Sequence, residues 1–252
     1  MRTLRTATLL ALLAPAAIHA QYGNGRAVQF TVRVENVSTP QTLKLSNGMT
    51  APAPTAPVLW AITDGDNPLF TPGRVDRGLG LERLAEEGNP GVLADYVRER
   101  VKAVAASGAV AMPVGDAAAG PIAPGKAYEF MVSAIPGQKL TLAFMFGQSN
   151  DWFYASGPRG IALFDAGGKP LSRDITSDLA LWDAGTEVNE EPGLGANQAP
   201  RQAAPNTGTA ERNPVRLVRQ LKGEYADKAP RTTDVIRVTV SASDGRLAGN
   251  RE

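Results

Sequence analysis

Apolar and polar residues alternate strictly in four segments of the chain. Successive side chains of a β-strand point to opposite faces, so this alternation predicts strands that bury one face. The four segments are 28–34, 128–134, 139–146 and 235–240. Weaker strand candidates are 43–45, 58–62 and 160–164. Most of these segments lie between clusters of Gly, Pro, Asn and Asp, which is typical of an all-β, antiparallel β-sandwich rather than of alternating helices and strands.

One helical region interrupts the strand pattern. Residues 81–87 have the pattern of a short helix that ends at Gly88. Asn89 and Pro90 then offer an N-cap followed by proline at the first helical position. Apolar residues recur at helical spacing after them, at Leu93, Val97, Val101 and Val104. We therefore expect a second helix over about 90–105, and we expect the pair to form a small insertion that packs over one end of the sheets.

The first 20 residues have the organisation of a secretory signal peptide. Arg2 and Arg5 precede an apolar run, and Ala20 is a suitable last residue before cleavage. The run is shorter than the roughly 18–20 apolar residues that a membrane span needs. We therefore predict a cleaved signal over 1–20, a secreted or periplasmic protein, and no transmembrane segment. An uncut N-terminal anchor is the alternative.

Charge and composition then limit the function. The chain has 26 Lys+Arg and 25 Asp+Glu, and two of the arginines lie in the predicted signal, which leaves 24 basic residues against 25 acidic ones. Nothing in this near-neutral balance suggests the basic face that nucleic-acid binding needs, so we predict no nucleic-acid partner. The one histidine, His19, also lies in the predicted signal, and the chain has no cysteine.

A mature chain without histidine or cysteine lacks several kinds of site. It cannot form a Ser-His-Asp triad or a Cys-His pair, and it cannot build a zinc or copper site on imidazole or thiolate. No disulfide can stabilise it. Any bound metal must be held by oxygen atoms, which indicates calcium, magnesium or manganese.

Acidic residues stand beside tryptophan in two motifs, NDWF (150–153) and LWDAGTE (181–187). Tryptophan favours burial, whereas a carboxylate favours water, a cation or a hydrogen-bond donor. We expect Trp152 and Trp182 to be buried and to fix two loops, about 150–154 and 182–191. Each tryptophan would then hold its neighbouring acid at the rim, facing a cation.

Within the second motif, Asp183 and Glu187 are separated by a bend at Gly185 that can turn both carboxylates to one point. Calcium takes about six to eight oxygen ligands, so two acids are too few. Asp151, which follows the strand predicted over 139–146, is the best third ligand. The alternatives are that these acids are solvated turn residues, or that Asp183 and Glu187 act as the acid/base pair of a glycosidase, which needs no histidine.

A long segment over 190–213 is rich in Pro, Gly, Asn and Gln and shows no apolar periodicity. Loops of this length in a compact domain are usually functional or disordered, and the neighbouring acidic motif favours function. Residues 241–252 have the composition of a C-terminal tail.

Four motifs together resemble the spondin N-terminal domain family, the module found in F-spondin and mindin. They are NDWF (150–153), GIALFD (160–165), LWDAGTE (181–187) and, as in the bacterial branch, NEEPGLGANQAPRQ (189–202). The resemblance covers about 27–240. It implies an eight-stranded antiparallel β-sandwich similar to a C2 domain, with one calcium ion held by loops at one end.

Carried over by motif, the calcium ligands of that family fall on Asp151, Asp183 and Glu187. The animal motif usually ends in Asp, whereas this chain has Glu187, which keeps the charge on a longer side chain. The animal proteins also carry cysteines and thrombospondin-type repeats that are missing here. We therefore expect a secreted Ca²⁺-binding module for adhesion or binding, not an enzyme, with a protein or glycan partner at a cell surface or matrix. The alternatives are a calcium-dependent carbohydrate-binding module and a carboxylate-based hydrolase.

Overall fold

The computed structural model of the chain describes residues 26–223 and 225–243. Strands account for 34% of the structure and helices for 14%, and the sheets are antiparallel, which confirms the prediction of an all-β fold. The predicted signal peptide, 1–20, lies outside the described residues. The first residues of the predicted tail, 241–252, belong to a strand. Residues 244–252 also lie outside the described residues.

The smaller of the two main sheets has the strand order β10-β13-β1-β6. Along β1 the even-numbered residues from 30 to 36 are buried and the intervening ones are partly exposed, so the predicted alternation is confirmed. Its neighbours β6 and β13 were also predicted, within one or two residues at each end. The strands are β1 (Val28–Asn36), β6 (Ala127–Ala134), β10 (Arg173–Asp174) and β13 (Ile236–Ala242).

The larger sheet has the order β12-β11-β8-β7-β4-β5, with β9 beside β7. Its central strands are buried almost without interruption, because both of their faces are covered. The strands are β4 (Val58–Thr63), β5 (Val104–Val110), β7 (Lys139–Met145), β8 (Trp152–Ser156), β9 (Ile161–Ala162), β11 (Leu179–Asp183) and β12 (Arg216–Leu217). A separate two-stranded hairpin joins β2 (Leu43–Lys44) to β3 (Thr50–Ala51).

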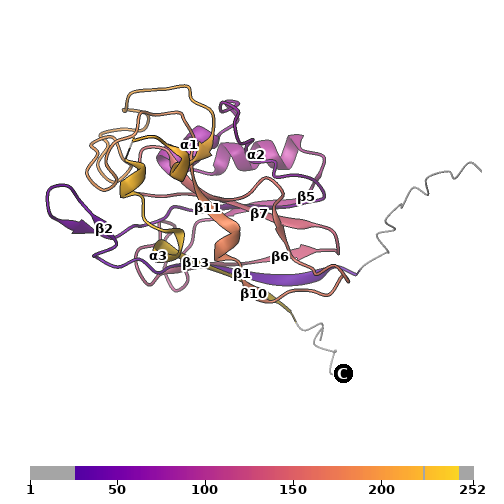
Figure 1. The fold of residues 1–252 in the computed structure, drawn as a ribbon. Helices are drawn as coiled ribbons and strands as arrows, with labels where there is room; N and C mark the ends of the chain where they lie inside the picture. Colours follow the sequence, from indigo (N-terminus) through magenta and orange to yellow (C-terminus); the bar gives the residue numbers. More distant parts are fainter. Residues whose placement is uncertain (1–25, 224, 244–252) are drawn as a thin grey trace, which may run out of the picture.

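Two apolar cores separate the layers of the molecule. One core contains side chains from both sheets, and its largest members include Phe30, Tyr128 and Trp152. The other lies between the larger sheet and the helices α1 (Leu81–Glu87) and α2 (Gly91–Arg100). Figure 1 shows the two helices above the strands β5, β7 and β11, with β1, β10 and β13 on the opposite side. The helical insertion therefore covers a face of the larger sheet, not one end as expected.

The two helices differ in how well the sequence predicted them. Helix α1 ends at Gly88 as expected, with a φ of 66° that favours glycine. The prediction that the second helix continues to about residue 105 was wrong. Helix α2 ends at Arg100, and Val101 is already extended. The residues from Val104 pair with β4 instead, so the apolar residue at this position serves a strand.

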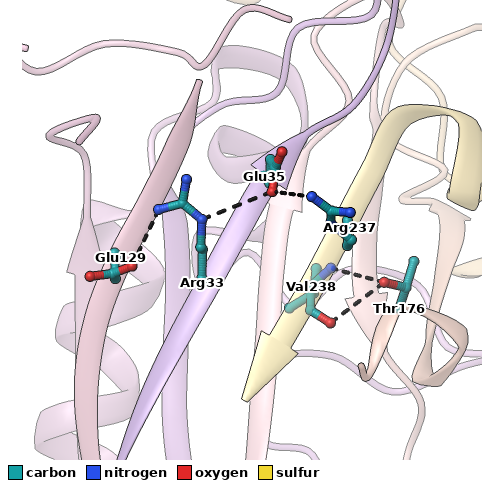
Figure 2. Close-up of polar contacts among 6 residues, drawn as sticks. All are labelled: Arg33, Glu35, Glu129, Thr176, Arg237 and Val238. Carbon is teal, nitrogen blue, oxygen red and sulfur yellow. Dashed lines mark hydrogen bonds and ion pairs between the residues drawn. The ribbon is translucent and has the colours of Figure 1, made fainter. Parts of the chain in front are cut away.

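The outer face of the smaller sheet carries a row of alternating charges (Figure 2). Arg33 lies 3.2 Å from Glu129 on one side and 3.9 Å from Glu35 on the other, and Arg237 lies 2.8 Å from Glu35. Exposed ion pairs of this kind add little to stability, typically about 0–1 kcal/mol each. The row therefore shows mainly that this face of the sheet meets solvent.

Short helical turns complete the chain around the sheets. The Thr176 hydroxyl accepts a hydrogen bond of 2.8 Å from the Val238 N–H, which ties the turn η1 to β13 (Figure 2). These turns are η1 (Thr176–Asp178), η2 (Val218–Gln220), η3 (Ala226–Lys228) and α3 (Thr232–Val235). Among the described helices, none is long and apolar enough to cross a membrane.

Candidate metal centre

Two neighbouring strands of the larger sheet bring Asp151 and Asp183 to the same end of that sheet. Asp151 immediately precedes β8, and Asp183 is the last residue of β11. The register of these antiparallel strands places Asp183 opposite Trp152. The Ala184 N–H then donates to the Asp151 carbonyl oxygen at 3.1 Å, so the pairing continues past the end of both strands.

The two tryptophans are buried, as the sequence indicated. Trp152 is fully buried and stacks on Phe146 in the core between the sheets, with ring centroids 6.3 Å apart. Trp182 is 6% exposed and contacts Phe70 on the helical side. The expectation that they sit in loops was wrong, since both belong to strands. A strand fixes its side chains more firmly than a loop, so the acids beside them have well-defined positions.

The Asp151 carboxylate has two very different oxygens. Its Oδ2 accepts hydrogen bonds from the backbone N–H groups of Thr186 (2.7 Å) and Glu187 (3.2 Å), and from the Thr186 hydroxyl (3.3 Å). Its Oδ1 is buried and has no hydrogen-bond partner among the described residues. A buried carboxylate oxygen without a donor is costly unless a cation neutralises it.

The shifted pKa of the Asp151 carboxyl group also indicates that its charge needs a neutralising cation. Burial raises the pKa of Asp151 well above its ordinary value, and the negative charge of Asp183 raises it further. The two backbone N–H groups from Thr186 and Glu187 oppose this rise without cancelling it. A cation placed between the two aspartates would offset both the cost of burying the charge and the repulsion from Asp183.

Glu211 completes a cluster of three acids with Asp151 and Asp183. One carboxylate oxygen from each residue lies within 4.8 Å of the other two. Both aspartates are fully buried, and Glu211 is partly buried. Only oxygen atoms are offered, so the cluster has the composition to hold a hard divalent cation.

The long segment over 190–213 delivers Glu211 to the cluster by returning alongside the residues that follow β11. The Glu211 N–H donates to the Thr186 carbonyl at 2.8 Å, and the Asn213 N–H donates to the Gly185 carbonyl at 2.8 Å. Gly185 has a φ of 69°, and a Cβ at this position would lie 2.4 Å from the Asn213 carbonyl oxygen. Only glycine allows this close approach, which explains its place in the DAGT motif.

The structure does not bring the Glu187 carboxylate into the cluster. Its Oε2 accepts a hydrogen bond of 2.9 Å from the Asn150 amide, and the Gly208 backbone also hydrogen-bonds this carboxylate. The side chain is 2% exposed, and burial raises its pKa. Glu187 contributes to the centre through its backbone, because its N–H donates to Asp151.

Three further residues near the centre are not predicted by any sequence pattern. Glu86 on α1 is 4% exposed and hydrogen-bonds the Thr186 side chain, and burial raises its pKa to about 7. Asn189 donates to Asp183 Oδ2 at 2.7 Å. Arg216 of β12 lies opposite Asp183 in the register, so a basic residue borders the acids. No spacing in the sequence links any of these residues to the acidic motifs.

Comparisons with known proteins do not assign the chain to a family. No family model matches it, and no curated protein is significantly similar in sequence. The site must therefore be interpreted from its own geometry.

Proposed function

We propose that this protein is a secreted Ca²⁺-binding module for adhesion or binding, built on a C2-like sandwich of eight strands and similar to the spondin N-terminal domain. The observation that supports it is the buried cluster of Asp151, Asp183 and Glu211. Two of these acids are the ones that the family resemblance implies as calcium ligands. In this proposal Glu211, not Glu187, is the third carboxylate ligand.

The strand lengths support the eight-stranded architecture. Within the described residues, eight strands run for five residues or more, and the remaining strands have two residues each. The eight are β1, β4, β5, β6, β7, β8, β11 and β13. Three of them belong to the smaller sheet and five to the larger one.

The burial of the cluster supports calcium over magnesium. Magnesium keeps several water ligands and demands near-octahedral geometry, whereas calcium accepts about six to eight oxygens in flexible arrangements. Asp151 and Asp183 are both 0% exposed, which leaves little room for a hydrated ion. Calcium is the ion that protein oxygens alone can satisfy most readily.

The same burial favours a stabilising role for the cation over a direct role in binding sugar or in hydrolysis. A lectin-type site needs open coordination positions, and a glycosidase needs its two carboxylates to flank the substrate. Asp183 and Glu187 are 0% and 2% exposed, and Glu187 is held by Asn150. A cation at this depth would join β8, β11 and the long segment, and so fix the surface built on them.

Thermal melts with calcium and with a chelator test the proposal. At a hundredfold excess over Kd, calcium binding stabilises the folded state by about 2.7 kcal/mol. For a domain of this size that corresponds to a rise in Tm of roughly 5–10 °C. Equal midpoints for the wild-type protein in calcium and in chelator would refute the proposal.

Matched variants identify the ligands in the same assay. Glu211→Gln should abolish most of the calcium-dependent rise in Tm, because it removes a carboxylate from the cluster. Glu187→Gln should keep most of it, since the Glu187 N–H stays in place. Glu129→Gln, on the distant outer face of the smaller sheet, is the control and should respond to calcium as the wild type does.

A further inference from the structure

Strand β11 has an edge that is only partly occupied. It pairs with β8 along its whole length, from Leu179 to Asp183. On its other side it pairs with β12 only at Trp182 and Asp183. Within the described residues, no strand faces the first three residues of β11 on that side. Open strand edges are templates for pairing with another extended chain.

The hydrogen-bonding pattern shows which backbone groups face the open side. In antiparallel pairs, successive residues alternate between bonding one neighbour and the other. The Ala184 N–H bonds Asp151 beside β8, so Asp183, Leu181 and Leu179 direct their backbone groups away from β8. Asp183 meets β12, and the Leu179 N–H donates to the Thr176 carbonyl. Among the described residues, no backbone group pairs with the Leu181 N–H and C=O or with the Leu179 C=O on that side.

A groove of about 410 Å³ lies along this part of β11. It is lined by residues 179–181 of β11, by residues 217–219, and by residues 226 and 229–232. Most of the lining side chains are apolar, among them Leu217, Ala229 and Pro230. This volume is in the range of ligand sites, and apolar walls beside a free strand edge suit the alternating side chains of an extended peptide.

The rim of the groove is basic. Arg219 lines it, is exposed, and makes no hydrogen bond or ion pair with any described residue. Arg231 also lines it and is paired with Asp234 through two hydrogen bonds of 2.9 Å. The residues that line the groove include these two arginines and no acidic residue. A partner with acidic side chains is therefore favoured electrostatically.

We infer that this groove binds an extended, acidic segment of a partner protein, which adds as a strand to the open edge of β11. Main-chain hydrogen bonds to Leu179 and Leu181 hold the segment, its apolar side chains enter the groove, and an acidic side chain pairs with Arg219. The inference rests on the proposed function in one respect: it names the partner class of the binding module.

A peptide array tests the inference on the full mature protein loaded with calcium. Each labelled pentapeptide carries glutamate at positions one, three and five, while positions two and four run through the apolar amino acids. Binding is measured by fluorescence anisotropy at low and high salt. We expect a subset with apolar preferences to bind, with weaker binding at high salt. The matched peptides with lysine in place of glutamate should bind at least tenfold more weakly.

Backbone methylation separates strand addition from simple apolar contact. In an extended pentapeptide, the N–H groups of alternate residues point to the same edge. N-methylation at positions two and four, or at one, three and five, therefore removes the donors of one edge only. One pattern should weaken binding at least tenfold, and the other should leave it within about twofold. Equal effects of both patterns would contradict strand addition.

Arg219→Glu tests the rim. It should weaken binding of the glutamate peptides at least tenfold and strengthen that of the lysine peptides, while the circular dichroism spectrum stays unchanged. Arg159→Glu replaces an exposed arginine in a turn that is not among the residues lining the groove; it is the matched control and should change neither. Unchanged binding by the Arg219 variant, or no binding anywhere in the glutamate array, would overturn the inference. If calcium still raises Tm in that case, the inference fails while the cation proposal stands.

Discussion

The two carboxylate oxygens of Asp151 differ: Oδ2 accepts three hydrogen bonds, whereas the buried Oδ1 accepts none from the described residues. The negative charge is therefore stabilised at only one of the two oxygens. In the absence of a cation, Asp151→Asn should be at least as stable as the wild type, because it removes an uncompensated buried charge. With calcium, the variant should lose the rise in Tm that the wild type shows. Differential scanning calorimetry in chelator and in calcium measures both effects. If the variant kept the calcium-dependent rise in Tm, Asp151 would not be a calcium ligand.

Glu86 gives a pH dependence whose sign follows from its burial. Its pKa is about 7 in the folded protein, against an ordinary value of 4.5. The unfolded chain therefore releases this proton first, and the folded state loses stability as pH rises from about 4.5 through 7. The loss is at most about 3 kcal/mol.

Glu86→Gln should remove this dependence, because glutamine does not titrate. Urea unfolding at pH 5 and pH 8, both in chelator, measures the difference in unfolding free energy. The variant should be more stable than the wild type at pH 8, and the two should differ less at pH 5. The same pH dependence in both proteins would show that Glu86 does not carry a raised pKa.

Gly185 tests the route by which the long segment reaches the site. Gly185→Ala strains a left-handed residue and also brings its Cβ against the Asn213 carbonyl oxygen, so we expect a loss of stability of about 2 kcal/mol or more and weaker calcium binding. Gly48→Ala is the matched control. Gly48 has a φ of 82° but nothing within 4 Å of an added Cβ, so it carries the strain without the collision. Equal losses in unfolding free energy for the two variants would contradict the role given to the close approach.

At the scale of elements, the sequence predicted strands well where large apolar side chains alternate with polar or smaller ones, as they do even in β7, which is buried on both faces. It predicted strands poorly where large apolar side chains are consecutive. Strands β1, β6, β7 and β13 were all identified from their patterns. Strand β8, with the sequence WFYAS, was not, because its three large aromatic residues are consecutive and all of its residues are buried. Its two faces lie against the smaller sheet and the helical side, so no alternation exists to be detected. Strand β11 was missed for a similar reason.

The site divides in the same way between predictable and unpredictable parts. Asp151 and Asp183 could be singled out because each stands next to a tryptophan whose burial limits where the acid can lie. Glu211 could not be, since its place depends on the path by which the long segment returns beside Gly185. The orientation of Glu187 depends equally on Asn150 and Gly208, which no local pattern connects to it.

Calcium should protect the long segment, 190–213, from proteolysis more than it protects any other exposed part of the chain. Glu211 belongs to the acidic cluster, and the next residue, Arg212, is exposed. Calcium should therefore slow tryptic cleavage after Arg212 by about tenfold or more, because cleavage needs local opening that the bound ion opposes. Mass spectrometry of timed digests measures the rate. Cleavage after Arg159 serves as the internal control, and equal slowing at both sites would contradict a local effect.

For the whole molecule, the N-terminal segment makes a separate prediction. If residues 1–20 direct export, expression of the full chain in a bacterial host should yield a periplasmic or extracellular product that begins at Gln21. Leu10→Arg should block processing, since it places a charge within the apolar run, whereas Thr3→Arg should not. Intact-mass measurement of fractionated cells distinguishes the outcomes. A wild-type product that retains Met1 in the cytoplasm would refute the prediction.

The acids at the ends of β8 and β11 and the acid on the returning segment are far apart in sequence but meet at one point. The chain has no cysteine, so no disulfide can join these segments. An ion held between the three acids would be a reversible, non-covalent cross-link between them. Forming this cross-link needs no oxidant, and breaking it needs no reductant. The rigidity of this end of the molecule would then depend on the calcium concentration around it. The same protein would be more rigid in a compartment rich in calcium than in one poor in calcium, without any chemical modification.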